Sequence, residues 1–176
     1  MSLWDYITRR DATAPAASSA SDTESIRRII RSLDQLEPAR ARHVAAFAFV
    51  LARVARADLV ITDEETAAME MMIVEQTGLP EEQAVLVVGI ARHQNLLFGG
   101  TDNFLVTREL KSSATTEEKH SLLRCLFAVS AADDSISTEE EGIITQIAAE
   151  LGIDREEMVR VRSEFRDKRA VFRRPR

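Results

Sequence analysis

Apolar residues recur at intervals of three and four along most of this chain, which is the spacing of helices that bury one face. One such stripe runs from Ile26 to Leu33, and a longer one runs from Val44 to Ala55. No segment alternates apolar and polar residues in the way that a half-buried strand does. We therefore predict an all-α fold, a compact helical bundle of about seven to nine helices.

Local signals mark where several of these helices begin and end. Pro38 suits the first turn of a helix, and Gly78 is placed to terminate one. The doublet Gly99-Gly100 marks a break before a shorter helix expected over residues 101–111. Four further helix starts carry the Ser/Thr/Asp-x-x-Glu pattern of a capping box. They are Thr62 with Glu65, Thr115 with Glu118, Ser137 with Glu140, and Asp154 with Glu157.

The two halves of the chain resemble each other in sequence. Ala57-Asp58 aligns with Ala132-Asp133, and Gly78-Leu79 aligns with Gly152-Ile153 after a slip of one residue. We predict a domain over residues 23–176 built from two pseudo-symmetric repeats, at about 38–98 and 115–170. Residues 1–22 are expected to form a short N-terminal segment and a flexible linker, because residues 11–22 are small and polar.

Composition narrows the classes of protein further. The chain has 176 residues, one Cys, and 29 Asp+Glu against 23 Lys+Arg. This length supports one core, and a lone cysteine excludes a disulfide-stapled scaffold. We expect a cytoplasmic protein, because the first residues lack a signal-peptide pattern and no apolar stretch is long enough to span a membrane. Basic residues gather in the last twelve positions, so we expect the acidic remainder to repel nucleic acid.

The most informative residues are two acidic turns. The first reads Ala-Asp-Leu-Val-Ile-Thr-Asp-Glu-Glu over residues 57–65, and the second reads Ala-Asp-Asp-Ser-Ile-Ser-Thr-Glu-Glu over residues 132–140. Both resemble the Ala-Asp-Gly-x-Ile/Val-x-x-x-Glu signature of the TerB family, the tellurite-resistance-associated helical domain that also occurs in a membrane-anchored DnaJ-like co-chaperone. Leu59 and Asp134 stand where the family has its glycine. The resemblance covers roughly residues 38–165.

The resemblance implies an all-helical module tied to bacterial stress response and tellurite resistance, with conserved acids suspected of binding a metal ion and no established enzymatic activity. Family members often act beside other proteins at the inner face of the membrane. We therefore expect a protein partner, peripheral membrane association through partners, and a scaffold or sensor function in place of catalysis.

The acidic turns also suggest a cation site on chemical grounds. Ca²⁺ and Mg²⁺ bind several carboxylate oxygens that the backbone already holds together. The spacing differs from that of an EF-hand, which needs acids at alternate positions and a central glycine. The predicted ligands form two clusters: Asp58, Asp63 and Glu65 in the first, and Asp133, Asp134 and Glu140 in the second.

Three alternatives stay open for these turns. Glu65 and Glu140 also fit as the closing residues of capping boxes, while Asp58 and Asp133 would accept hydrogen bonds from turn amides. In a metal enzyme, the aspartates of the turns would leave a coordination position open for substrate. A metal-free adaptor would instead use the acidic surface to bind a basic partner. We expect no enzyme, because no His, Lys or Ser is placed to share in the chemistry.

Other candidate residues have simpler interpretations. The three histidines form no His-Glu-x-x-His pair, and Cys125 lies on an apolar helix face as a small buried hydrophobe. The Met69, Met71 and Met72 cluster is typical of core filling. Trp4 and Tyr6 belong to a short amphipathic segment ahead of the linker. This segment folds back onto the domain, stays disordered, or docks onto a partner or membrane surface.

Overall fold

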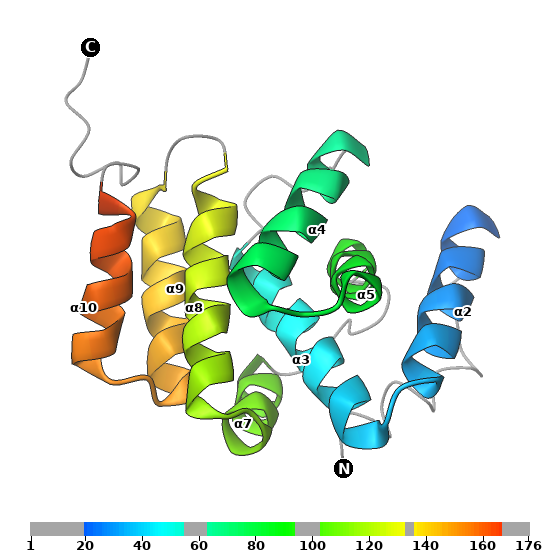
Figure 1. The fold of residues 1–176 in the computed structure, drawn as a ribbon, viewed down its shortest axis with the longest axis horizontal. Helices are drawn as coiled ribbons and strands as arrows, with labels where there is room; N and C mark the ends of the chain where they lie inside the picture. Colours follow the sequence, from blue (N-terminus) through cyan, green and yellow to red (C-terminus); the bar gives the residue numbers. More distant parts are fainter. Residues whose placement is uncertain (1–19, 55–62, 94–102, 133–135, 167–176) are drawn as a thin grey trace.

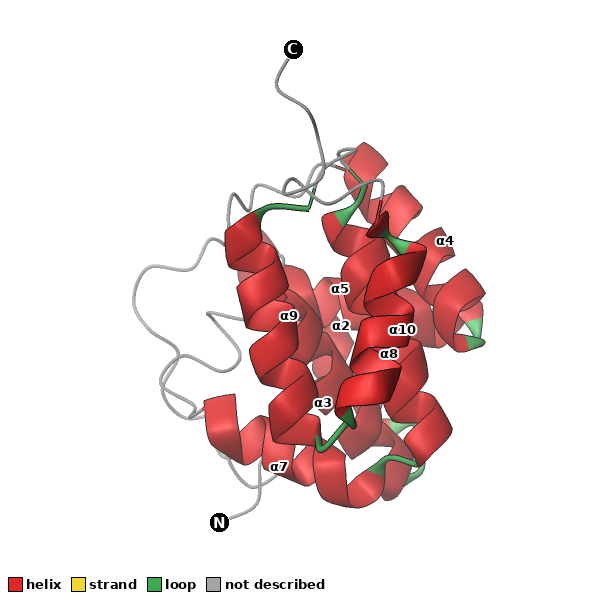
Figure 2. Cartoon of the chain, turned by 90° about the vertical axis from the view of Figure 1, so that its left-hand side faces the viewer, coloured by secondary structure: helices red, strands yellow, loops and turns green. Residues whose placement is uncertain are grey.

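The computed structural model describes residues 20–54, 63–93, 103–132 and 136–166. In these ranges the chain forms eight α-helices and no β-strand (Figure 1; Figure 2). The predicted all-α fold and the predicted number of helices are both confirmed. The helices are α2 (Ala20–Asp34), α3 (Pro38–Val54), α4 (Asp63–Thr77), α5 (Glu81–Arg92), α7 (Asn103–Ser113), α8 (Thr116–Ser130), α9 (Thr138–Leu151) and α10 (Arg155–Glu164).

Helix α3 is the centre of the bundle. Every residue from His43 to Val54 is buried, and the helix packs against α2, α5, α7, α8 and α9. Its alanines, among them Ala45 and Ala48, leave room for neighbours on several sides, so that all faces of α3 meet another helix. Pro38 opens the helix as predicted, and the Glu37 carboxylate accepts a hydrogen bond from the Ala39 N–H at 2.9 Å.

The packing between the two halves is reciprocal. Helix α4 packs against α8, and α9 packs against α3. Exchanging the predicted repeats would convert one of these pairs into the other, so the cross-contacts fit a two-fold arrangement. Contacts inside each half differ, because α5 touches both α3 and α4 whereas α8 touches both α9 and α10. The repeats themselves therefore stay a prediction.

Two glycines end the helices that precede α5 and α10. Gly78 follows α4 and Gly152 follows α9, with backbone φ angles of 66° and 74°. These values lie in the left-handed region, which glycine adopts without the steric penalty of a Cβ. The Ile153 N–H closes the end of α9 by donating to the Ala148 carbonyl at 3.0 Å. The predicted stop at Gly78 is confirmed.

Some element boundaries differ from the expected ones. Helix α2 begins at Ala20, so residues 20–22 belong to a helix and not to the expected linker. Helix α5 ends at Arg92. The helix expected over residues 101–111 is α7, which runs from Asn103 to Ser113.

Candidate functional site

The predicted cation ligands lie mostly outside the described residues. Asp58, Asp133 and Asp134 fall in the ranges that the structure does not describe. Asp63 and Glu65 belong to the first turn of α4, but their side chains are not described either. Glu140 is the one predicted ligand whose carboxylate can be placed.

Glu140 closes a capping box at the start of α9. Its Oε2 accepts a hydrogen bond from the Ser137 N–H at 2.8 Å, and the Ser137 hydroxyl accepts from the Glu140 N–H at 3.1 Å. The capping interpretation of Glu140 is therefore confirmed, and this bond uses one of its two carboxylate oxygens. Ile136, just before the cap, is almost completely buried and fixes the turn to the core.

The helices that follow the two turns begin at the same end of the bundle. Helices α4 and α9 both start at the upper end in Figure 1, where α8 also ends. The last residue of α8 is Ser130, whose hydroxyl is buried and has no hydrogen-bond partner in the structure. Ser130 precedes Asp133 by three positions. A hydroxyl oxygen without a hydrogen-bond partner therefore lies close in sequence to the second acidic turn.

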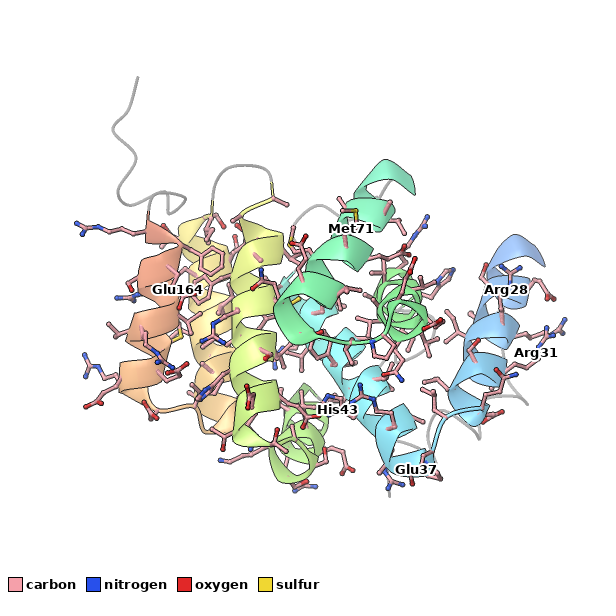
Figure 3. The ribbon with its side chains drawn as sticks, viewed as in Figure 1. Arg28, Arg31, Glu37, His43, Met71 and Glu164 are labelled. Carbon is pink, nitrogen blue, oxygen red and sulfur yellow. The ribbon has the colours of Figure 1, made fainter. Side chains whose placement is uncertain are left out.

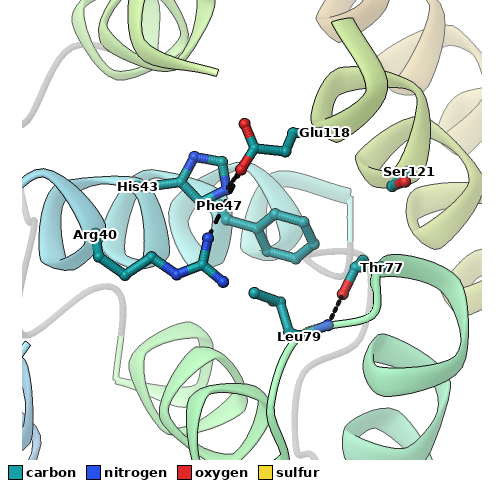
Figure 4. A pocket seen from close by; sticks show the side chains of 7 residues that line it. All are labelled: Arg40, His43, Phe47, Thr77, Leu79, Glu118 and Ser121. Atoms are coloured by element: carbon teal, nitrogen blue, oxygen red, sulfur yellow. Dashed lines mark hydrogen bonds and ion pairs between the residues drawn. The ribbon is translucent and has the colours of Figure 1, made fainter. Parts of the chain in front are cut away.

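A second candidate site, which the sequence did not reveal, is a polar cavity of about 110 Å³ (Figure 4). Helix α3 contributes Arg40 and His43 to it, and α8 contributes Glu118. The Glu118 Oε1 lies 3.9 Å from the His43 Nε2 and 3.7 Å from an Arg40 guanidinium nitrogen. Arg40 is held in place by a second contact, because its Nε donates to the Gln83 side chain on α5 at 2.8 Å.

Glu118 has two functions in this cavity. It closes the predicted capping box of α8, since its Oε2 accepts from the Thr115 N–H at 2.8 Å. Its other oxygen, Oε1, faces α3. The same carboxylate thus caps α8 and joins its first turn to the central helix. It also places an acidic group beside the buried His43.

The surroundings shift the pKa of both titratable groups. Burial lowers the pKa of His43, and the Arg40 cation lowers it further, although Glu118 acts in the opposite direction. Burial alone would raise the pKa of Glu118, but the Thr115 hydrogen bonds and the nearby His43 and Arg40 outweigh it and leave that pKa below its ordinary value. The neutral imidazole and the ionised carboxylate are therefore the favoured forms.

A third polar cluster joins α8 to α10. The Glu157 carboxylate is buried, with its Oε1 3.3 Å from the His120 Nδ1 and 3.9 Å from Arg124, while Oε2 pairs with Arg160. Asp154 caps α10 as predicted by accepting from the Glu157 N–H at 2.8 Å. Only this half of the predicted box is formed, because the buried Glu157 carboxylate lies beside Arg124 and Arg160 instead.

Among the described residues, no three His, Cys, Asp or Glu side chains are grouped so that they could hold a metal ion. Cys125 is fully buried, and burial raises the pKa of its thiol to about 12, so its interpretation as a small hydrophobe is confirmed. Met69 is buried as expected for core filling, but Met71 is 66% exposed and lies on the outer side of α4 (Figure 3). Core filling is therefore wrong for Met71.

Comparison with known protein families shows the family to which this chain belongs. The family described as tellurite resistance protein TerB matches residues 44–163, from within α3 to the last but one residue of α10. The chain belongs to the TerB family. The match covers both acidic turns, and it confirms the resemblance found in the sequence. No curated protein and no solved structure matches the chain.

The TerB match leaves α2 outside. This helix ends at Asp34, ten positions before the matched region begins at residue 44. In this TerB-family chain the helix still packs on the matched core, against α5 and α3. In the described part of the chain, no helix combines the length and the apolar character that crossing a membrane requires.

Proposed function

We propose that this protein is a non-catalytic module of tellurite resistance and bacterial stress response, which acts as an interaction scaffold or sensor and binds a divalent cation at its acidic turns. The observation that carries this proposal is the common position of the helix starts that follow both turns, at one end of the bundle. Carboxylates concentrated at one end favour a hard cation such as Ca²⁺ or Mg²⁺.

The residues of the second turn suit such an ion in their chemistry. Asp133 and Asp134 would supply carboxylate oxygens, and Glu140 keeps one oxygen that the Ser137 bond does not use. The buried Ser130 hydroxyl has no hydrogen-bond partner, and a hydroxyl oxygen is a hard neutral donor. The first turn would offer Asp58, Asp63 and Glu65 in the same way. A bound cation would neutralise this end of the molecule and thereby change which partner it attracts.

Calorimetric titration tests the cation proposal. Chelator-treated protein is titrated with Ca²⁺, Mg²⁺, Mn²⁺ and Zn²⁺, and the titration is repeated on a variant with Asp58→Asn, Asp133→Asn and Asp134→Asn. A matched control removes three exposed acids elsewhere, by Asp34→Asn, Glu117→Gln and Glu156→Gln. We expect saturable binding that the turn variant loses and the control keeps. Equal weakening in both variants would mean diffuse attraction to an acidic protein and would overturn the site.

The second candidate function is a metal-free adaptor that binds a basic partner through its acidic surface. It is favoured by the engagement of Glu140 in helix capping, which accounts for that residue without any ion. Absence of binding for every ion in the same titration would select it. In that case the turn variant would still bind a basic partner more weakly than the parent does, and the affinity of the parent would fall as the salt concentration is raised.

A further inference from the structure

A groove runs along α2 where this helix faces α4 and α5. We call it the α2 groove, and its cavity measures about 260 Å³. Its floor is formed where Ile29 of α2 packs on Gly89 of α5: a Cβ added at position 89 would lie 3.6 Å from the Ile29 Cδ1. The residues that line the groove are Ser25, Arg28, Ile29, Ser32, Thr66, Glu70, Glu82, Val85, Leu86, Gly89, Arg92 and His93.

The groove combines an apolar centre with charges of both signs. Val85 is 47% exposed, and it lies beside the buried Leu86. Arg28 of α2 and Arg92 of α5 carry positive charges at the groove, and Glu70 of α4 and Glu82 of α5 carry negative ones. The cavity is smaller than the roughly 300–1,000 Å³ typical of pockets for small-molecule ligands. It fits a few side chains of a peptide that is apolar and carries both charges.

The chain itself contains such a peptide nine residues ahead of α2. Residues 3–10 read Leu-Trp-Asp-Tyr-Ile-Thr-Arg-Arg, with four apolar or aromatic side chains, one acid and two arginines. Asp5 complements Arg28, and Arg9 with Arg10 complement Glu70 and Glu82.

The connection to α2 is long enough for this peptide to reach the groove. Nine residues, 11–19, separate it from Ala20, and they span at most about 30 Å when extended. The groove begins at Ser25, about 8 Å along the helix from Ala20 at 1.5 Å per residue. A tether of this length gives an effective concentration on the order of millimolar, so a weak contact suffices for occupancy.

We infer that residues 3–10 dock into the α2 groove of their own chain. The docked peptide covers Val85 and makes this face unavailable to other proteins until the peptide is displaced. The α2 wall of the groove lies outside the TerB match, so this device is an addition to the family's core.

Fluorescence of the full-length chain tests the docking, because Trp4 is its one tryptophan. We expect Trp4 emission to be blue-shifted, and acrylamide quenching to be several-fold weaker than in the urea-unfolded chain. The variant Val85→Glu should shift the emission to the red and restore quenching. The matched control is Val159→Glu, an equally exposed valine on α10, on the far side of the bundle from α2; it should leave both signals unchanged.

A second variant keeps the test decisive if Val85→Glu unfolds the chain. Glu82 is exposed, and Glu82→Lys should weaken docking by repelling Arg9 and Arg10. Adding Arg9→Glu and Arg10→Glu to this variant reverses the charge on both sides and should restore docking. Three outcomes would overturn the inference. They are a Trp4 signal already like that of the unfolded chain, protection that no groove variant changes, and protection that rises with protein concentration, which would place the peptide in the groove of a second copy.

Discussion

Arg53 on α3 and Glu150 on α9 form a two-point ion pair that joins the two halves of the molecule. The Arg53 guanidinium nitrogens lie 2.6 and 3.2 Å from the two carboxylate oxygens of Glu150, across 97 positions of sequence. The Arg53 side chain is 6% exposed and that of Glu150 is 18% exposed. Burial alone would raise the pKa of Glu150, but the bonds from Arg53, Thr107 and Gln146 lower it.

We predict that breaking this pair costs more when the arginine is left without its partner. Glu150→Gln leaves a nearly buried cation unpaired, which typically costs about 3–5 kcal/mol of unfolding free energy. Arg53→Met leaves the more exposed carboxylate, so its cost should be smaller. Urea unfolding of both variants and of the double variant Arg53→Met/Glu150→Gln measures the coupling. An Arg53→Met variant less stable than Glu150→Gln would contradict this ranking.

Replacing glycine by alanine should raise the unfolding free energy at one position of this fold and lower it at two others. Gly78→Ala and Gly152→Ala each place a Cβ in the left-handed region and should lower the unfolding free energy by roughly 1–2 kcal/mol. Gly142 lies inside α9 with open space where its Cβ would be, so Gly142→Ala should raise it by about 0.5–1 kcal/mol. Thermal and urea denaturation compare the three. Stabilisation at Gly78 or Gly152 would show that these φ angles are wrong.

Local sequence signals predicted the parts of this fold that depend on neighbouring residues. The capping partners Ser137 and Glu140 are three positions apart, and Gly78 acts through its own backbone, so both could be recognised from the sequence. The cavity could not, because His43 and Glu118 come from opposite halves and meet only once α8 packs on α3. The Thr-x-x-Glu pattern identified Glu118 as a capping residue but gave no sign of its second contact.

The capping box at α9 separates the two interpretations of Glu140. Ser137→Ala removes the hydroxyl acceptor and should cost about 1 kcal/mol of stability. Glu140→Gln keeps a side-chain oxygen that can accept from the Ser137 N–H, because Gln also closes such boxes. We expect Glu140→Gln to be nearly as stable as the parent in urea unfolding but to bind a divalent cation more weakly in calorimetry. Unchanged cation affinity would restrict Glu140 to capping.

The buried thiol of Cys125 should be inert in the folded protein. With its pKa at about 12, almost none of it is thiolate at neutral pH, and the thiolate is the reactive form. We expect a disulfide-exchange reagent to label one thiol quickly in urea and very slowly in native buffer. Fast labelling of the native chain would contradict the burial of α8 in the core.

The His43 cavity should make the protein less stable on mild acidification. The folded-state pKa of His43 lies below its ordinary value of 6.5, so the unfolded chain takes up a proton first as the pH falls. More protons bound by the unfolded state mean that the unfolding free energy decreases as the pH drops below about 6.5. Glu118 acts in the same direction at lower pH, because its stabilisation is lost as the pH falls through its lowered pKa.

Two charge-removing variants should move the His43 pKa in opposite directions. Glu118→Gln removes the anion that favours the imidazolium and should lower this pKa further, whereas Arg40→Gln removes a repelling cation and should raise it. The Gln at position 118 can still close the α8 capping box, so the helix start is preserved. Proton NMR titration of the His43 ring measures both shifts, with His93, which lies outside this cavity, as the internal control. Shifts of the same sign in the two variants would mean that loss of packing, and not charge, sets the His43 pKa.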